Sequence, residues 1–158
     1  MKKIFLSGDH AGFKDKEKIR DWTKLKEFEI LDFGPFTYDE KDDYPDFVIP
    51  MSRALVKDRA IRGIIIAGSG EGEAIVANKI KGIRAIVYHG KNLKIVKTAR
   101  EHNNANVLCL GSRFVGESEM KKAIMIFLKT KFDGGALRGG HVGRHERRIK
   151  KFERLGGK

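Results

Sequence analysis

The segment IIIAGSGEGE, residues 64–73, begins with four consecutive apolar residues and ends in a turn of glycines and glutamates. A short, wholly apolar run is typical of a strand that helices cover on both faces. We expect this strand over Ile64–Ala67, a glycine-rich turn over Gly68–Gly72, and a helix from there to about Ile80. Strands that alternate with helices in this way are characteristic of a parallel sheet wound on both sides.

Short apolar runs and amphipathic stretches continue this alternation along the chain. We therefore predict an α/β protein, a three-layer α/β/α Rossmann-like domain with a five-stranded parallel sheet. The expected strands are Lys3–Ser7, Phe28–Phe33, Ile64–Ala67, Arg84–Tyr88 and Val107–Leu110, and the other expected helices are Phe13–Leu25, Phe47–Val56, Leu93–His102, Ser118–Lys131 and His145–Leu155.

The length of 158 residues suits one compact domain. No apolar run approaches the ~20 residues of a membrane-spanning helix, and the first residues do not form a secretory signal, so we expect a cytoplasmic protein without membrane contact. The single cysteine, Cys109, excludes an internal disulfide framework and is expected to be a small core residue.

Positive charge is concentrated at the end of the chain. The net charge is +12, and the last 21 residues carry half of it. A basic segment can bind a polyanion, one small phosphate or an acidic partner, or simply be solvated. A nucleic-acid-binding protein is the alternative of another class, although no recognition motif supports it. We expect an α/β domain over 1–135 and a basic C-terminal arm over 136–158 that packs on a neighbouring subunit.

Ionisable residues flank several predicted strands. Ligands of open parallel sheets bind beyond the carboxyl ends of the strands. We therefore expect one edge of the sheet to carry the site, formed by residues that follow the first strand, follow the third, and lie on both sides of the fifth. These are Asp9 and His10, the turn at 68–73, and the segments Arg100–Asn103 and Gly111–Arg113.

The glycine turn leads into a helix whose first N–H groups can hold a phosphate or a developing oxyanion. Its spacing differs from a dinucleotide fingerprint, and it lacks the lysine of a nucleotide-triphosphate loop. Glu71 and Glu73 are unfavourable beside a simple anion site and favour proton transfer. They point in different directions at a helix start, so only one can face the strand edge, and their spacing does not choose between them.

Two histidines each fit two roles. His102 is either a capping or solvent-exposed residue or a reactive group, and His10 is either a helix-entry residue capped by Asp9 or a site residue. Metal-ligand spacing is absent, since the sequence has neither HExxH nor a cysteine pair, and we expect no metal site.

A set of motifs runs in order along nearly the whole chain: SGDHAGF at 7–13, DYPDF at 43–47, AGSG at 67–70, ANK at 77–79, GIRA at 82–85, REHNNANVL at 100–108, GSR at 111–113, GG at 134–135 and RHERRI at 144–149. Together they resemble type B ribose-5-phosphate isomerases. The wider family includes the subunits of galactose-6-phosphate isomerase, which are expected to lack the Asp-His pair of this sequence.

The resemblance implies a cofactor-free aldose–ketose isomerase that interconverts D-ribose 5-phosphate and D-ribulose 5-phosphate through an enediolate, in the pentose phosphate pathway. It implies a homodimer or tetramer with the site at the subunit interface. His102 would open the sugar ring with help from Asp9, while Ser69 and the N–H groups of Gly70–Gly72 would hold the enediolate.

The resemblance also implies residues that bind the substrate. Arg144 and Arg148 would come from the neighbouring subunit. The phosphate candidates are His10, Arg113, Arg144 and Arg148, the sugar would be lined by Tyr44 and Asn103, and the turn would contribute Gly68, Gly70, Glu71 and Gly72.

Two departures from the family pattern matter. Many members carry a cysteine base directly before the glycine turn, where this sequence has Ala67. Another subgroup uses a glutamate at the position of Glu73, so the resemblance selects Glu73 as the base. The extra segment 136–143 adds Arg138 and leaves open which arginines reach the phosphate.

The nearest alternative activity is isomerisation of another sugar phosphate, such as allose 6-phosphate, galactose 6-phosphate or a tetrose phosphate.

Overall fold

The structure is a computed structural model that describes residues 2–22, 25–134 and 143–155. Within them, a parallel five-stranded sheet has the order β2-β1-β3-β5-β4, which confirms the predicted α/β architecture. The strands are β1 (Lys2–Gly8), β2 (Phe28–Asp32), β3 (Arg62–Ala67), β4 (Ala85–Tyr88) and β5 (Val107–Gly111), and the helices are α1 (Phe13–Arg20), α2 (Pro45–Leu55), α3 (Glu71–Asn78), α4 (Lys94–Asn103), α5 (Glu117–Lys129) and α6 (Arg144–Phe152).

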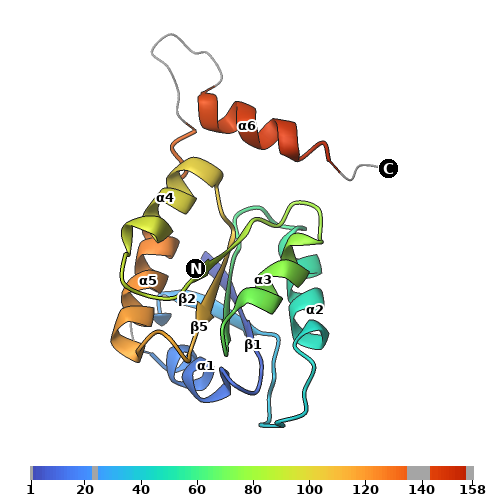
Figure 1. The fold of residues 1–158 in the computed structure, drawn as a ribbon, viewed down its shortest axis with the longest axis vertical. Helices are drawn as coiled ribbons and strands as arrows, with labels where there is room; N and C mark the ends of the chain where they lie inside the picture. Colours follow the sequence, from blue (N-terminus) through green and yellow to red (C-terminus); the bar gives the residue numbers. More distant parts are fainter. Residues whose placement is uncertain (1, 23–24, 135–142, 156–158) are drawn as a thin grey trace.

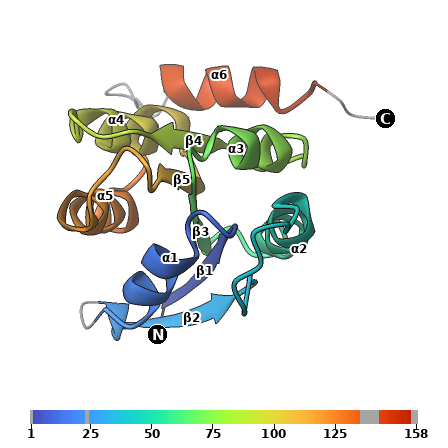
Figure 2. The ribbon, with the colours of Figure 1, turned by 60° about the horizontal axis from the view of Figure 1, so that its bottom comes forward.

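Helices cover both faces of the sheet, as Figure 2 shows. Side chains alternate along each strand, so Ile64 and Ile66 join the core under α1, α4 and α5, whereas Ile65 joins the core under α2 and α3. Cys109 is fully buried in the second of these cores, as expected for a small core residue. Burial on both faces explains why the Ile64–Ala67 part of β3 is a continuous apolar run.

The strand order reverses between β1 and β3, and α1 begins close to this point. A Cβ atom on Gly12 would lie 1.9 Å from the carbonyl oxygen of Ile66, so only glycine allows the chain to pass over β3 here. The α1 residue Lys16 is fully buried, and its Nζ donates to an Asp32 carboxylate oxygen at 2.6 Å at the end of β2. The crevice of a doubly wound sheet lies at such a reversal.

Some element boundaries differ from those expected. The helix expected over Phe13–Leu25 ends at Arg20. The next turn is of the tighter 3₁₀ type, in which the Trp22 N–H donates to the carbonyl of Ile19, three residues earlier. The helix expected to begin at Phe47 begins two residues earlier, at Pro45, whose missing N–H leaves no helical bond unmade at this position. Both changes move helix boundaries without changing the layers.

The last helix, α6, lies beside α4 of the same chain (Figure 1). Only His145 and Ile149 of this helix are buried. The extra segment 136–143, which includes Arg138, lies outside the described residues except for Gly143. The expected packing of the arm on a neighbouring subunit stays a prediction.

Candidate active site

The turns that follow β1, β3 and β5 are joined at the carboxyl edge of the sheet. The Ser112 N–H donates to the Ala67 carbonyl at 2.7 Å, and its Oγ donates to the Ala11 carbonyl at 3.1 Å. Asp9, which is buried, accepts the Gly12 N–H at 2.8 Å through Oδ1. These bonds fix the three turns relative to one another, as a preorganised site requires.

Glu73 faces inward from the first turn of α3, while Glu71 faces outward. Glu73 is only 4% exposed. The Glu71 side chain is 58% exposed, and one of its oxygens lies 3.5 Å from Nε2 of His89. The left-handed conformation of Gly70, with φ of 81°, sets this direction for the start of α3. The geometry therefore separates two glutamates that their spacing did not distinguish.

Burial raises the pKa of the Glu73 carboxyl above its usual value. The negative charges of Asp9 and Asp42 act in the same direction, whereas its own backbone N–H and the positive charge of His10 oppose the rise. All of these groups therefore lie within electrostatic reach of the Glu73 carboxyl. A buried carboxyl with a raised pKa, close to other titratable groups, is typical of a general acid or base.

His10 is paired with Asp42, a residue that no sequence motif singled out. Nδ1 of His10 lies 2.6 Å from Oδ1 of Asp42, and this hydrogen bond raises the pKa of His10, with burial opposing the rise. The other carboxylate oxygen of Asp42 is buried without a hydrogen-bond partner among the described residues. In the sequence Asp42 is one of several acids in a loop, and nothing but its charge marks it.

The glycine turn is enclosed by side chains from other elements. A Cβ atom on Gly72 would lie 2.7 Å from the Tyr44 hydroxyl, and one on Gly68 would lie 3.2 Å from the Arg113 guanidinium carbon. Tyr44 and Arg113 therefore pack directly on bare backbone. The hydroxyl of Ser69 accepts the Glu71 N–H at 3.3 Å, and this hydrogen bond within the turn stabilises its conformation.

His89, at the end of β4, also contacts this turn, although nothing beyond its residue type marks it in the sequence. Its Nε2 lies 2.8 Å from the carbonyl oxygen of Ser69, which can only accept, so His89 is the donor. Its ring packs against Phe114 at a centroid distance of 5.1 Å. A Cβ atom on Gly111 would lie 3.0 Å from the His89 ring, so the absence of a side chain there leaves room for it.

We call the site candidates that lie at this edge the carboxyl-edge group. Their members come from the turns after β1, β3 and β5 and from the residue before α2. They are Asp9, His10, Tyr44, Gly68, Ser69, Gly70, Glu71, Gly72, Glu73 and Arg113.

The remaining candidates form a second cluster, which we call the starting-edge group: His102, Asn103, Arg144 and Arg148. His102 and Asn103 end α4, and the His102 ring stacks on His145 of α6 at 4.1 Å with an interplanar angle of 10°. Burial lowers the pKa of His145, and the nearby His102, Arg144 and Arg148 act in the same direction. The chain therefore places imidazole and guanidinium groups together where α4 meets α6.

The prediction that Arg100–Asn103 converges with the other candidates on one edge is wrong. These residues precede β5 and lie where that strand starts, whereas Gly111–Arg113 lies where it ends. The five residues of β5 separate the two edges by roughly 16 Å at the usual rise per residue. A proton-transferring side chain must be within about 3 Å of the atom it serves, so the two groups of one chain cannot act on the same sugar carbon.

The described part of the chain holds neither a cluster of metal ligands nor a membrane-spanning helix. Across these residues, histidine, cysteine, aspartate and glutamate side chains form no group of three that would hold a metal ion. None of the helices found in residues 2–22, 25–134 and 143–155 has the length and apolar character needed to span a bilayer.

A doubly wound sheet with a buried carboxyl beside a bare-backbone turn is typical of α/β enzymes that use acid–base chemistry. Residues 4–152 match the family described as Ribose/Galactose Isomerase, and the chain belongs to this family.

Named relatives cover nearly the whole chain. A probable ribose-5-phosphate isomerase B of Mycoplasma genitalium is 42% identical over 96% of this chain and 93% of its own. The crystal structure of the enzyme from that organism with bound ribulose-5-phosphate superposes with a TM-score of 0.85 at 42% identity, covering 96% of this chain and 94% of the other. The type B enzyme of Trypanosoma brucei gives a TM-score of 0.84 at 35% identity, covering 97% of both chains.

Proposed function

We propose that this protein interconverts D-ribose 5-phosphate and D-ribulose 5-phosphate, as a step of the pentose phosphate pathway that needs no cofactor. The observation that carries the proposal is the buried Glu73 carboxyl beside the N–H groups of the glycine turn. The relatives named for this activity, one of them with ribulose-5-phosphate bound, support it. They do not favour a nucleic-acid-binding protein.

The reaction moves two protons within the sugar. One passes from C2 to C1, and the other passes from the C2 hydroxyl to the C1 oxygen, so nothing is gained or lost overall. Glu73 takes the carbon proton as a carboxylate and returns it to the neighbouring carbon. The developing oxyanion of the enediolate is held by Ser69 and by the N–H groups of Gly70–Gly72.

The site is completed by a second copy of the chain. His102 opens the furanose ring, and it cannot do so beside Glu73 of its own chain because the two lie at opposite edges of the sheet. We therefore propose a homodimer, alone or within a tetramer, in which the starting-edge group of one subunit meets the carboxyl-edge group of the other. Asn103 then contacts the sugar, and Arg144 and Arg148 bind the phosphate together with His10 and Arg113. The cytoplasmic location stays a prediction.

The most direct test of the function is turnover of pure ribose 5-phosphate in the presence of a chelator. We expect ribulose 5-phosphate to appear at the same rate with and without the chelator. Allose 6-phosphate and galactose 6-phosphate, offered separately at equal concentration, should react more slowly. Faster turnover of either hexose phosphate would transfer the proposal to that substrate, and no turnover of any of them would refute it.

The pH dependence of kcat should report the Glu73 carboxyl. The base must be ionised, so kcat falls as the pH falls through its pKa, and burial raises this pKa above the ordinary 4.5. We expect the acid limb to lie above pH 4.5. It should move little with temperature, because the ionisation enthalpy of a carboxyl is small whereas that of an imidazole is large. An acid limb at or below that value, or one that moves strongly with temperature, would contradict the assignment.

A further inference from the structure

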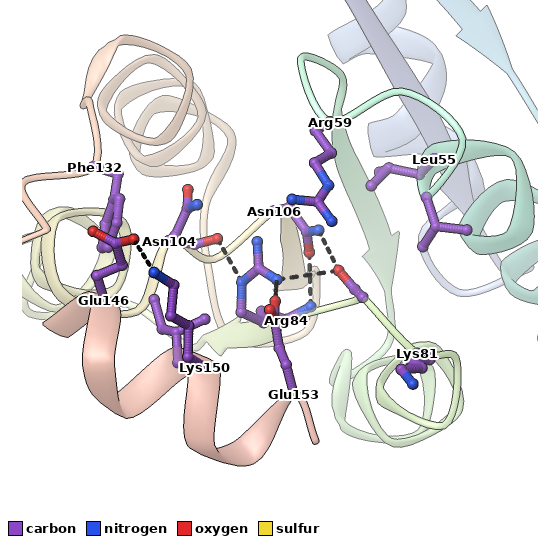
Figure 3. A pocket seen from close by; sticks show the side chains of 13 residues that line it. Leu55, Arg59, Lys81, Arg84, Asn104, Asn106, Phe132, Glu146, Lys150 and Glu153 are labelled. Atoms are coloured by element: carbon purple, nitrogen blue, oxygen red, sulfur yellow. Dashed lines mark hydrogen bonds and ion pairs between the residues drawn. The ribbon is translucent and has the colours of Figure 1, made fainter. Parts of the chain in front are cut away.

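Arg84, just before β4, joins three separate segments at the starting edge of the sheet (Figure 3). Its Nε donates to the Asn104 carbonyl at 2.9 Å. Its Nη1 donates to the Gly82 carbonyl at 3.3 Å and to Oε1 of Glu153 at 2.8 Å. The side chain is only 16% exposed, and burial lowers the pKa of its guanidinium. Such a group is held in one geometry, because a buried guanidinium needs its acceptors.

Asn106 ties the same segments together a second time. Its Nδ2 donates to the Gly82 carbonyl at 2.8 Å, and its Oδ1 accepts the Arg84 N–H at 2.7 Å. Asn104 is in the left-handed conformation directly after α4, and its Oδ1 accepts from the Arg100 guanidinium at 3.0 Å. This network fixes the backbone immediately after His102 and Asn103, and so fixes where these two side chains start.

The contact from Arg84 to Glu153 extends this network to α6. Glu153 caps the end of α6, and the stack of His145 on His102 holds the beginning. Between these two contacts a cavity of about 630 Å³ borders the helix (Figure 3). Ile149 is the one buried apolar side chain among the described α6 residues. With so little apolar burial, the position of α6 depends on its polar contacts.

We propose that Arg84 and Glu153 are positioning residues for substrate binding: their ion pair fastens α6 to the sheet and holds Arg144 and Arg148 in register with His102. The proposal rests on the proposed function, in which the starting-edge group binds the phosphate and opens the sugar of a neighbouring subunit. The pair touches no reacting atom. Its effect is to present two helices to the partner as one preformed surface, which lowers the ordering cost of binding.

The test compares two variants of equal charge change. Glu153→Gln removes the ionic contact with Arg84 and leaves the other Arg84 bonds in place. Glu146→Gln is the matched control, because Glu146 lines the same cavity but pairs at 2.7 Å with Lys150 of its own helix. We expect Glu153→Gln to raise KM for ribose 5-phosphate about three- to fivefold, the upper part of the range for a partly exposed ion pair, with kcat unchanged. Glu146→Gln should change neither value.

Hydrogen exchange of the α6 amides supplies a readout that does not depend on activity. We expect faster exchange over Arg147–Glu153 in Glu153→Gln than in Glu146→Gln or in the unmodified protein, at equal melting temperature. If exchange or KM is the same in the two variants, the positioning role is refuted, whereas the isomerase function stands if both still turn over ribose 5-phosphate. If neither the unmodified protein nor the variants turn over the sugar, the proposed function fails. Hydrogen exchange then still tests the ion pair independently, because equal exchange in the two variants would refute its role in holding α6.

Discussion

Replacing the Glu73 carboxyl by an amide should lower kcat by at least a hundredfold and leave KM almost unchanged. Glutamine has the same shape and is tolerated by the same buried position, but it cannot accept a proton from carbon. A general base contributes about 10²–10⁴-fold to a rate, and Glu73→Gln removes this contribution. Because substrate contacts are kept, the loss should fall on kcat, which steady-state kinetics with ribose 5-phosphate will measure.

Glu71→Gln is the comparison that gives this result its meaning. The two glutamates lie in the same helical turn, but only Glu73 is buried, within electrostatic reach of Asp9. Glu71 lies on the surface beside His89. We expect Glu71→Gln to keep kcat within the same order of magnitude as the unmodified protein. The reverse pattern, with Glu71→Gln crippled and Glu73→Gln active, would exchange the two roles.

Two inactive variants should restore activity when their subunits are mixed. Glu73→Gln damages the carboxyl-edge group, and His102→Asn damages the starting-edge group. If each site takes one group from each subunit, a mixed dimer contains one intact site and one doubly damaged site. Random pairing then returns about a quarter of the unmodified activity, since half of the dimers are mixed. The measurement is turnover of ribose 5-phosphate after the two variants are co-refolded in equal amounts.

The control for this mixing experiment pairs two variants of the same group. Glu73→Gln mixed with Asp9→Asn has no combination of subunits that builds an intact site from both groups. This mixture should regain nothing. If Glu73→Gln and His102→Asn also regain nothing while mixed dimers are demonstrably present, both groups serve a site within one chain, and the two-subunit site is refuted.

The sequence predicted the layers of the fold because burial imposes a visible pattern. The run Ile64–Ala67 is apolar at every position because helices cover both faces of β3. This requirement acts on consecutive residues, so it can be recognised in the sequence alone. Helix ends were less predictable. Whether α1 stops at Arg20 or continues depends on how the following residues pack against other elements, which no local pattern records.

The sequence predicted which types of residue form the candidate site better than it predicted where in the fold these residues lie. Asp9, Ser69 and Glu73 follow strands, so parallel topology brings them to one edge. His102 precedes a strand, and the same topology sends it to the opposite edge. Asp42 went unrecognised because its role depends on a contact of 2.6 Å with His10, thirty-two positions away in the chain. Contacts of this kind are created by the fold and leave no periodic trace in the sequence.

The proposed mechanism requires that the Glu73 carboxylate, and no other group, carries the proton between C1 and C2. Deuterium exchange into ribulose 5-phosphate in D₂O isolates this step, because this ketose cannot close a furanose ring and its exchange needs no ring opening. Followed by NMR at C1, the unmodified protein and Glu71→Gln should incorporate deuterium, whereas Glu73→Gln should not. Incorporation by Glu73→Gln at the unmodified rate would show that another group carries the proton.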